Sequence, residues 1–240
     1  MANGRYAPIV LAFEPKALAR CFLVADLLAE QYDEPLLEYG LIGLADRSRP
    51  LHVVETPLLV GQEVTVSTVE QSGANVLEMR REIQTLSRKR GSPMIPITFI
   101  HRHPGACRPS QTDHEFLAGV FIDQISTTHT FQEILSGESE EFLCRTCAAS
   151  MPGRSRRAFR FNDSTVELEY AVGFSLIVNK EREYSITALR KEFCPSCGAG
   201  ELCYVPAEMA LRPQRPLTSH ELNEVRKALE LEIAAKVRFC

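Results

Sequence analysis

Three segments of the chain carry apolar residues at helical spacing. The first covers residues 15–31 and has a proline in its first turn. The second covers residues 75–90 and ends at a Gly-Ser-Pro stop signal. The third covers residues 218–238 and opens with the capping box Thr218-Ser219-His220-Glu221. These patterns predict three amphipathic helices.

Short runs rich in β-branched and aromatic residues, separated by turn residues, occupy much of the remaining chain. They lie at residues 39–44, 52–54, 63–69, 95–100, 166–170 and 173–178. The run 95–100 is short and mostly apolar, as expected of a buried strand. Residues 114–135 fit a helix or a helix followed by a strand, and residues 137–141 read as an exposed acidic link. Together these runs predict an α/β fold with a curved, mixed β-sheet flanked by the first two helices.

The domain organisation follows from length and from a change in composition. A chain of 240 residues suits one main domain with a small module. From about residue 137 the composition shifts toward Cys, Arg, Ser and Gly. We expect a core over 1–136, a cysteine-bearing insertion over 137–205 that shares strands with the core, and a C-terminal helix over 206–240. That helix either closes the core or mediates dimerisation.

The charge balance excludes an overall basic surface. With 27 Lys and Arg against 31 Asp and Glu, the formal net charge is −4, so nucleic acid is not an expected partner. Two local basic runs, at 80–90 and 154–160, are interpreted as solvated surface. The apolar stretches are too short for a membrane span, and the N-terminus lacks a secretory signal pattern. We expect a cytoplasmic protein without a membrane partner.

The segment that follows the buried run 95–100 contains metal-ligand side chains. His101 and His103 are two residues apart, so on an extended strand end both imidazoles point to one side. A loop returning to a helix start can bring Asp113 to them as a third ligand. Two histidines and one carboxylate leave the fourth tetrahedral position open, which is typical of catalytic rather than structural zinc.

This segment resembles the motif of the JAMM metallopeptidases, also called JAB or MPN+. The family pattern is His-x-His-Pro, a short loop and Ser-x-x-Asp, which His101, His103, Pro104, Ser110 and Asp113 match. The loop here is one residue shorter than in the family. The resemblance implies a JAMM-like catalytic core over 1–136, with sheet and helix layers similar to those of cytidine deaminases. It also implies a zinc-dependent hydrolase.

The family also uses an upstream glutamate, in a Glu-x-x-Gly pattern before an apolar strand. Glu38, followed by Tyr39 and Gly40, is the best approximation, again one residue short, with Glu34 and then Glu55 as alternatives. The resemblance implies that Glu38 is the general base and that Ser110 donates a hydrogen bond to the oxyanion. A zinc-bound water, with its pKa lowered to about 7, would be the nucleophile.

The substrate class is implied by the resemblance alone. Family members cleave the isopeptide or peptide bond after the C-terminus of ubiquitin or a ubiquitin-like protein. The compact chain is more similar to prokaryotic members, so we expect a deubiquitinase-like isopeptidase that deconjugates or matures a ubiquitin-like modifier. Its setting would be a bacterial antiviral defence system with E1-like and E2-like operon partners. The cysteine-bearing insertion is a candidate docking surface for the modifier or its target.

Four of the eight cysteines form two Cys-x-x-Cys knuckles. Cys144 and Cys147 make the first, Cys194 and Cys197 make the second, and 46 residues separate the two. Four thiolates in two knuckles are typical of a closed structural zinc site, although a redox dithiol stays open. Because the spacing is long, we expect a β-segment of the main domain between the knuckles. Cys203 could replace one ligand, while three further cysteines look incidental: Cys21, Cys107 and Cys240.

Other functions fit less well. A zinc nucleobase deaminase needs His-x-Glu followed by Pro-Cys-x-x-Cys, and neither pattern occurs. A thiol protease lacks a recognisable Cys/His context. The main alternative is a catalytically silent MPN-like scaffold or a zinc-knuckle interaction protein. The presence of both histidines, the serine and the aspartate argues against it, because a scaffold has no need of an open metal site. We therefore expect one catalytic and one structural zinc.

Overall fold

A computed structural model gives the fold, and it describes residues 8–32, 38–64, 69–70, 73–103, 105–119, 131–135, 138–140, 144–150, 158–160, 166–179, 181–194, 196–213 and 215–239. The helices are α1 (Pro15–Tyr32), α2 (Gly73–Arg90), α3 (Gln111–Glu115), α4 (Arg145–Ala149) and α5 (Ser219–Lys236). The three long helices, α1, α2 and α5, are the three that the apolar spacing predicts.

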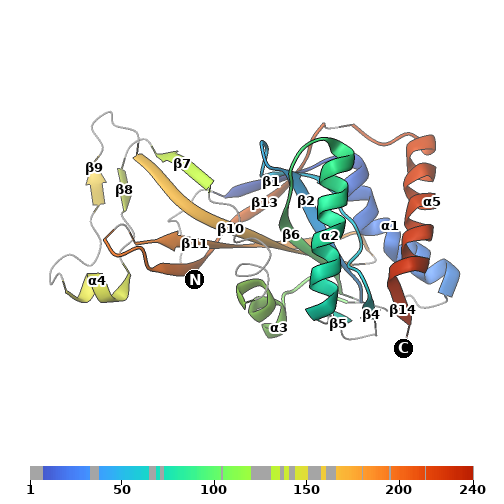
Figure 1. Cartoon of the computed structure of the whole chain (residues 1–240), viewed down its shortest axis with the longest axis horizontal. Coiled ribbons are helices and arrows are strands. Elements are labelled where there is room, and N and C mark those ends of the chain that lie inside the picture. Colours follow the sequence, from blue (N-terminus) through green and yellow to red (C-terminus); the bar gives the residue numbers. More distant parts are fainter. Residues whose placement is uncertain are drawn as a thin grey trace.

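One nine-stranded sheet forms the centre of the molecule (Figure 1). Along its path lie β12 (Gly200–Val205), β11 (Tyr184–Phe193), β10 (Val166–Val178), β6 (Met94–Arg102), β2 (Gly40–Asp46), β3 (His52–Glu55), β1 (Ile9–Phe13) and β13 (Ala207–Leu211). The ninth strand, β7 (Phe131–Leu135), pairs with the start of β10. Parallel and antiparallel pairs both occur, which confirms the predicted mixed sheet. Since only Pro206 separates β12 from β13, the path nearly closes on itself.

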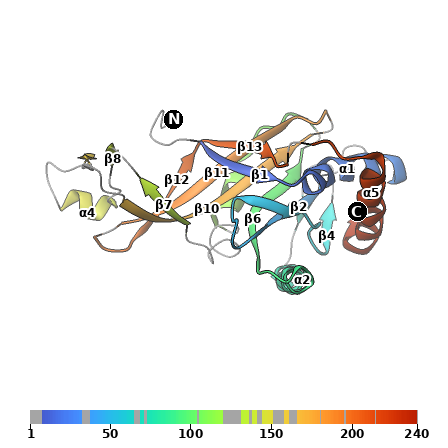
Figure 2. The same cartoon turned by 90° about the horizontal axis from the view of Figure 1, so that it is seen from above.

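Helices cover both faces of this sheet (Figure 2). Side chains of β2 alternate between the two faces. Leu41 lies in the core beneath α1 and α5, and Ile42 lies in the core beneath α2 and residues 116–118. Burial on both faces explains why the central strands read as continuous apolar runs. Gly43 allows β2 and β6 to approach closely, because a Cβ there would lie 2.1 Å from Cγ2 of Thr98.

Several expectations about individual segments need correction. The run 63–69 is not one strand: β4 (Gln62–Val64) and β5 (Val69–Glu70) pair antiparallel, so the chain reverses between them. The last helix ends at Lys236, and the β-favouring residues after it form β14 (Val237–Phe239) beside β4. Within the acidic link, residues 138–140 form β8 (Glu138–Glu140), which pairs with β9 (Ala158–Arg160).

Other segments extend the predicted pattern. The runs 166–170 and 173–178 are one strand, β10. Residues 114–135 include the end of α3 and the strand β7, while residues 120–130 between them lie outside the described part. The strands β10 and β11 confirm that main-sheet structure lies between the two cysteine knuckles. The strands β1, β11, β12, β13 and β14 were not predicted from the sequence.

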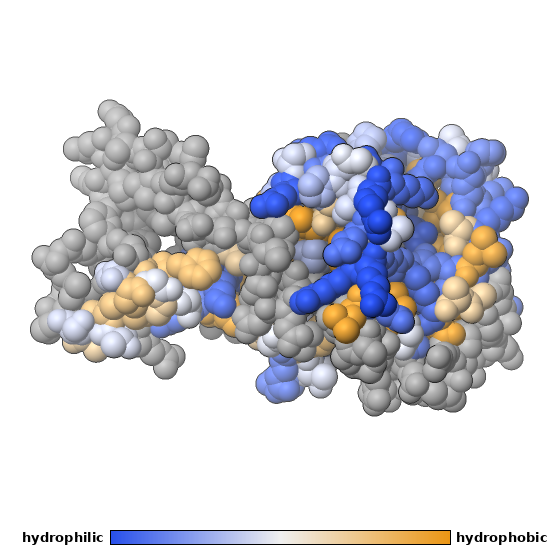
Figure 3. Space-filling view, in the orientation of Figure 1, coloured by the Kyte–Doolittle hydropathy of each residue, from blue (hydrophilic) through white to orange (hydrophobic). Residues whose placement is uncertain are grey.

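The basic run 80–90 lies on the exposed side of α2, and hydrophilic residues, in blue, cover this part of the main body in Figure 3. Arg90, the last residue of α2, pairs with Glu55, the last residue of β3, at 3.1 Å. Of the second basic run, residues 154–157 lie outside the described residues. None of the helices in the described part of the chain is both long and apolar enough to cross a membrane.

Candidate metal centres

The strand β6 places both candidate histidines at one end of the sheet. His101 is the second-last residue of β6, which ends at Arg102, and it is only 3% exposed. Its ring stacks on Phe99 with the ring centroids 5.1 Å apart. His103 follows the strand, and its backbone N donates to Val178 O of β10 at 3.0 Å. Two strands of the sheet therefore hold the histidine pair.

Helix α3 delivers the carboxylate. Ser110 is the N-cap residue, and its hydroxyl accepts from Asp113 N at 3.2 Å. In return, Oδ2 of Asp113 accepts from Ser110 N at 2.6 Å and from the Ser110 hydroxyl at 2.8 Å. This capping box begins the helix and fixes the Asp113 side chain. The Ser-x-x-Asp part of the motif therefore has a local structural cause.

His101, His103 and Asp113 come together despite the short loop. Nε2 of His101 lies 3.0 Å from Nε2 of His103 and 2.9 Å from Oδ1 of Asp113. Nε2 of His103 lies 3.4 Å from Oδ2 of Asp113. Ligand atoms about 2.0–2.1 Å from a tetrahedral zinc are about 3.3 Å apart, so these separations suit that ion. The donor set therefore fits a metal, and the three residues could hold one.

The charges at this centre are arranged as a metal site requires. Burial tends to raise the pKa of Asp113, but hydrogen bonds from His101 and then His103 outweigh it and hold that pKa well below its usual range. The hydrogen bond to Asp113 is the largest cause that raises the pKa of His103. Without a cation, the Asp113 carboxylate favours a proton on His103. A divalent ion would replace this proton as the positive charge at the centre.

The structure also places Glu38 beside the histidines. It lies two residues before Gly40, which pairs with His101 across β2 and β6. Burial raises the pKa of Glu38, and the charges of His103 and Asp113 both act on it. Of the alternatives, Glu34 lies outside the described residues, and Glu55 forms an ion pair with Arg90. Glu38 is thus the glutamate, among those described, that the fold brings to this centre.

A buried glutamine holds the start of β2, although no sequence pattern singles it out. The Gln62 side chain is fully buried. Its Oε1 accepts from Gly40 N at 2.8 Å, and its Nε2 donates to Gly40 O at 3.2 Å. A side chain at Gly40 would come within 2.6 Å of Leu59. Gln62 therefore fixes the strand end from which Glu38 extends.

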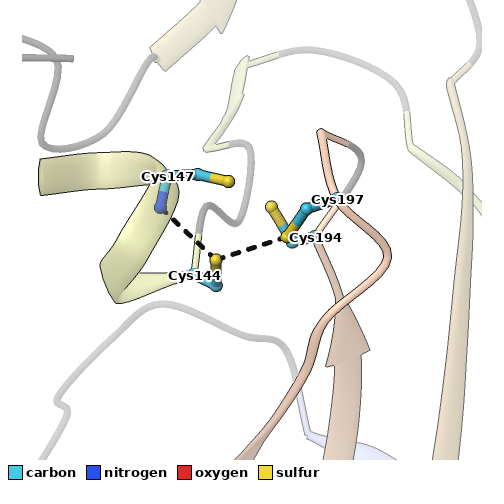
Figure 4. Close-up of side chains that lie close together, drawn as sticks. All are labelled: Cys144, Cys147, Cys194 and Cys197. Atoms are coloured by element: carbon cyan, nitrogen blue, oxygen red, sulfur yellow. Dashed lines mark hydrogen bonds between the residues drawn. The ribbon is translucent and has the colours of Figure 1, made fainter. Parts of the chain in front are cut away.

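The four knuckle cysteines form a second group (Figure 4). Cys144 and Cys147 come from the start of α4, and Cys194 and Cys197 from the turn after β11; their sulfur atoms all lie within 4.8 Å of one another. The Sγ atoms of Cys144 and Cys197 are 3.5 Å apart, close to the spacing of about 3.8 Å expected around tetrahedral zinc. All four are free thiols. The group can hold a metal ion.

The remaining cysteines lie elsewhere. The thiol of Cys203 donates to Arg190 O at 3.5 Å and packs against the main core, so this residue is not a substitute ligand. Cys21 is buried and donates to Ala17 O at 3.3 Å. Cys107 lies in the loop before α3 and donates to Glu183 O at 3.3 Å. Cys240 lies outside the described residues.

The two candidate centres lie at opposite ends of one strand pair. Val178 and Tyr184, at the turn between β10 and β11, are near the histidines, while Cys194 follows the far end of β11. Ten residues of strand span about 30 Å at about 3.4 Å per residue. In Figure 1, α4 accordingly lies at the far end of the β10–β11 extension from α3. The centres are separate, and neither contributes a ligand to the other.

A comparison of the chain with models of known protein families gives no match, and no curated protein sequence matches it significantly. The argument for a function therefore starts from the arrangement of these side chains.

Proposed function

We propose that this protein is a JAMM-type zinc metallopeptidase that cleaves an isopeptide or peptide bond after the C-terminus of a ubiquitin-like protein. The observation that carries the proposal is the meeting of His101, His103 and Asp113 beside Glu38. Residues from three separate elements converge there, and a chance His-x-His pair has no reason to acquire both carboxylates. The motif resemblance supplies the substrate class.

The three ligand residues would hold the ion with one side accessible. His101 is buried, whereas the side chains of His103 and Asp113 are 16% and 14% exposed. His103 and Asp113 are therefore the ligand residues that a substrate could reach. A zinc ion bound there supplies Lewis acidity and a hydroxide nucleophile at neutral pH.

The protein's own side chains then handle the protons. Glu38 accepts the proton released when the nucleophile forms and passes it to the departing amine. Its half-buried position favours this exchange, because burial raises the pKa of Glu38 and so makes it a better proton acceptor. Ser110 orients Asp113 through the capping box. To stabilise an oxyanion, its hydroxyl would have to turn away from Asp113 while the backbone N of Ser110 keeps the carboxylate in place.

The cysteine group, by this proposal, holds a structural zinc that organises the far end of the β10–β11 extension. That end lies about 30 Å from the histidines, and it is a candidate docking surface for the modifier or its target. We also propose that the modifier belongs to a bacterial antiviral system with E1-like and E2-like partners. This part of the proposal rests on the resemblance of the motif alone.

The test is zinc content per chain together with cleavage of a ubiquitin-like fusion protein. We expect two zinc ions in the wild type and one in either His103→Ala or Cys194→Ser, with cleavage lost in His103→Ala. A single zinc that is insensitive to His103→Ala would instead indicate a catalytically silent scaffold. Two zinc ions without cleavage of any ubiquitin-like fusion would reject the substrate class and keep the metal centre.

A further inference from the structure

The loop that joins His103 to Ser110 has few contacts of its own. Gly105 and Ala106 are exposed, and a Cβ added to Gly105 would meet no atom within 4 Å. Within the loop, Arg108 N donates to Ala106 O at 2.8 Å. Ordering such a segment costs conformational entropy. Its position must therefore come from contacts with its neighbours.

This loop continues directly from a metal ligand. Nε2 of His103 faces Asp113, the backbone N of His103 donates to Val178 O, and Gly105 follows two residues later. In metal sites, contacts outside the ligand set fix the direction of the ligating imidazole. The position of Gly105 therefore limits where the His103 ring can point.

Asn179 holds the loop from the side. It directly follows β10, is only 3% exposed, and uses both donor hydrogens of its amide. Nδ2 donates to Gly105 O at 3.3 Å and to Glu183 Oε2 at 2.9 Å, while Oδ1 accepts from Glu183 N at 2.9 Å. A buried amide with this many partners has a single orientation.

The turn that carries Asn179 is itself anchored. Val178, the last residue of β10, pairs with Arg102 of β6 and accepts from His103 N. Across the turn, Asn179 N donates to Glu183 O at 3.2 Å. The same carbonyl of Glu183 accepts from the thiol of Cys107, which gives the loop a second attachment. Asn179 thus connects the loop to the end of strand β10 beside the metal ligands.

We infer that Asn179 is a positioning residue for the His101–His103–Asp113 centre, acting through Gly105 on His103. This inference rests on the proposed function, in that it takes the three residues to bind zinc. Loss of an outer contact of this kind weakens metal binding by about 10–100-fold. The hydrogen bond from Nδ2 of Asn179 to Gly105 O is the contact that supports metal binding. Asn179 itself contacts neither metal nor substrate.

The test is the zinc affinity of the open site, measured by competition with a chelator in full-length protein. The zinc ion that is absent in His103→Ala identifies that site, and the cysteine-bound ion is an internal reference. Asn179→Ala removes the whole amide. Asn179→Asp keeps an acceptor for Glu183 N but lacks the donor to Gly105 O. Arg182→Asn is the matched control. Arg182 lies exposed in the same turn, its side chain pairs with Asp26 at 3.4 Å, and it has a positive φ that asparagine tolerates. The substitution keeps the backbone hydrogen bond from residue 182 to Asn179 O.

We expect both Asn179 variants to bind zinc at the open site at least about tenfold more weakly, with the cysteine-bound zinc, the circular dichroism spectrum and the Arg182→Asn control unchanged. Equal affinity in wild type and Asn179→Asp would overturn the inference and leave the proposed function standing. Loss of zinc from both sites in Asn179→Asp would also overturn it, because the residue would then support folding in general. A wild type with zinc only at its cysteines would overturn both proposals.

Discussion

The hydroxyl of Ser110 donates a hydrogen bond of 2.8 Å to Oδ2 of Asp113, the carboxylate that completes the candidate metal centre. The same hydroxyl caps helix α3 by accepting from Asp113 N. One side chain therefore both starts the helix and aims the third ligand. Two roles for Ser110, ligand orientation and oxyanion stabilisation, can be separated by experiment.

Replacing Ser110 with alanine should lower the zinc affinity of the open site by about tenfold, because Asp113 loses an orienting hydrogen bond. Helix α3 should also lose about 1 kcal/mol of capping stability. Ser110→Thr keeps both hydrogen bonds and should behave as wild type. The measurement is a chelator competition on each variant. Unchanged zinc affinity with kcat reduced by about 10²–10³ would assign Ser110 to the oxyanion instead.

Replacing Glu38 with glutamine should abolish proton transfer without removing a ligand. We expect kcat on a ubiquitin-like fusion to fall by about 10²–10⁴, with both zinc ions retained. Glu55→Gln is the control, since Glu55 pairs with Arg90 away from the histidines. Parallel measurements of zinc content and cleavage rate check this. Loss of cleavage in Glu55→Gln, with Glu38→Gln fully active, would show that Glu55 and not Glu38 is the general base.

The ligand residues could be predicted because their spacing is local. His101, His103, Ser110 and Asp113 lie within thirteen residues, and strand alternation plus a capping box are enough to bring them together. Glu38 is different, since it reaches the site through the pairing of β2 with β6. The sequence suggested it only through the family pattern, and left two other glutamates as alternatives.

The supporting residues could not be predicted, because their partners are distant in sequence. Gln62 forms a hydrogen bond with Gly40, and Asn179 forms one with Gly105. The spacing of apolar residues along the chain predicts neither contact. The same reason explains the missed strand β1, a five-residue apolar run whose strand character depends on parallel pairing with β3 and β13. Asn179 did carry one weak signal, as a polar residue directly after a buried strand.

Replacing Cys194 with serine should remove one zinc ion and leave the other. The cysteine group lies about 30 Å from the histidines along β11, and the two sites share no ligand. We expect zinc content to fall from two to one and the thermal midpoint to drop, while the open site keeps its affinity. Cys203→Ser is the control, since its thiol packs in the main core. A loss of both ions in Cys194→Ser would mean that the far end of the extension supports the open site.

The contact between helices α1 and α5 predicts a pH-dependent stability that is independent of any metal. Glu232 of α5 is paired with Arg20 of α1, and its Oε1 accepts from Lys236 at 2.6 Å and from Leu58 N at 2.8 Å. Burial raises the pKa of Glu232, but the charges of Arg20 and then Lys236 outweigh it and lower that pKa. The group therefore stabilises the fold above its unfolded pKa of about 4.3, and this contribution is lost as the pH falls through the lower, folded value.

Replacing Glu232 with glutamine should accordingly lower the free energy of unfolding at pH 7 by about 3 kcal/mol, because partly buried Arg20 loses its carboxylate partner and Lys236 keeps only Glu82. The difference from wild type should narrow as the pH falls below about 4.3. Urea denaturation at a series of pH values measures both effects. Glu230→Gln is the matched control on the same helix, where an exposed pair with Arg226 should contribute less than about 1 kcal/mol. A constant difference between wild type and Glu232→Gln at every pH would show that the carboxylate's charge does not stabilise the contact between the two helices.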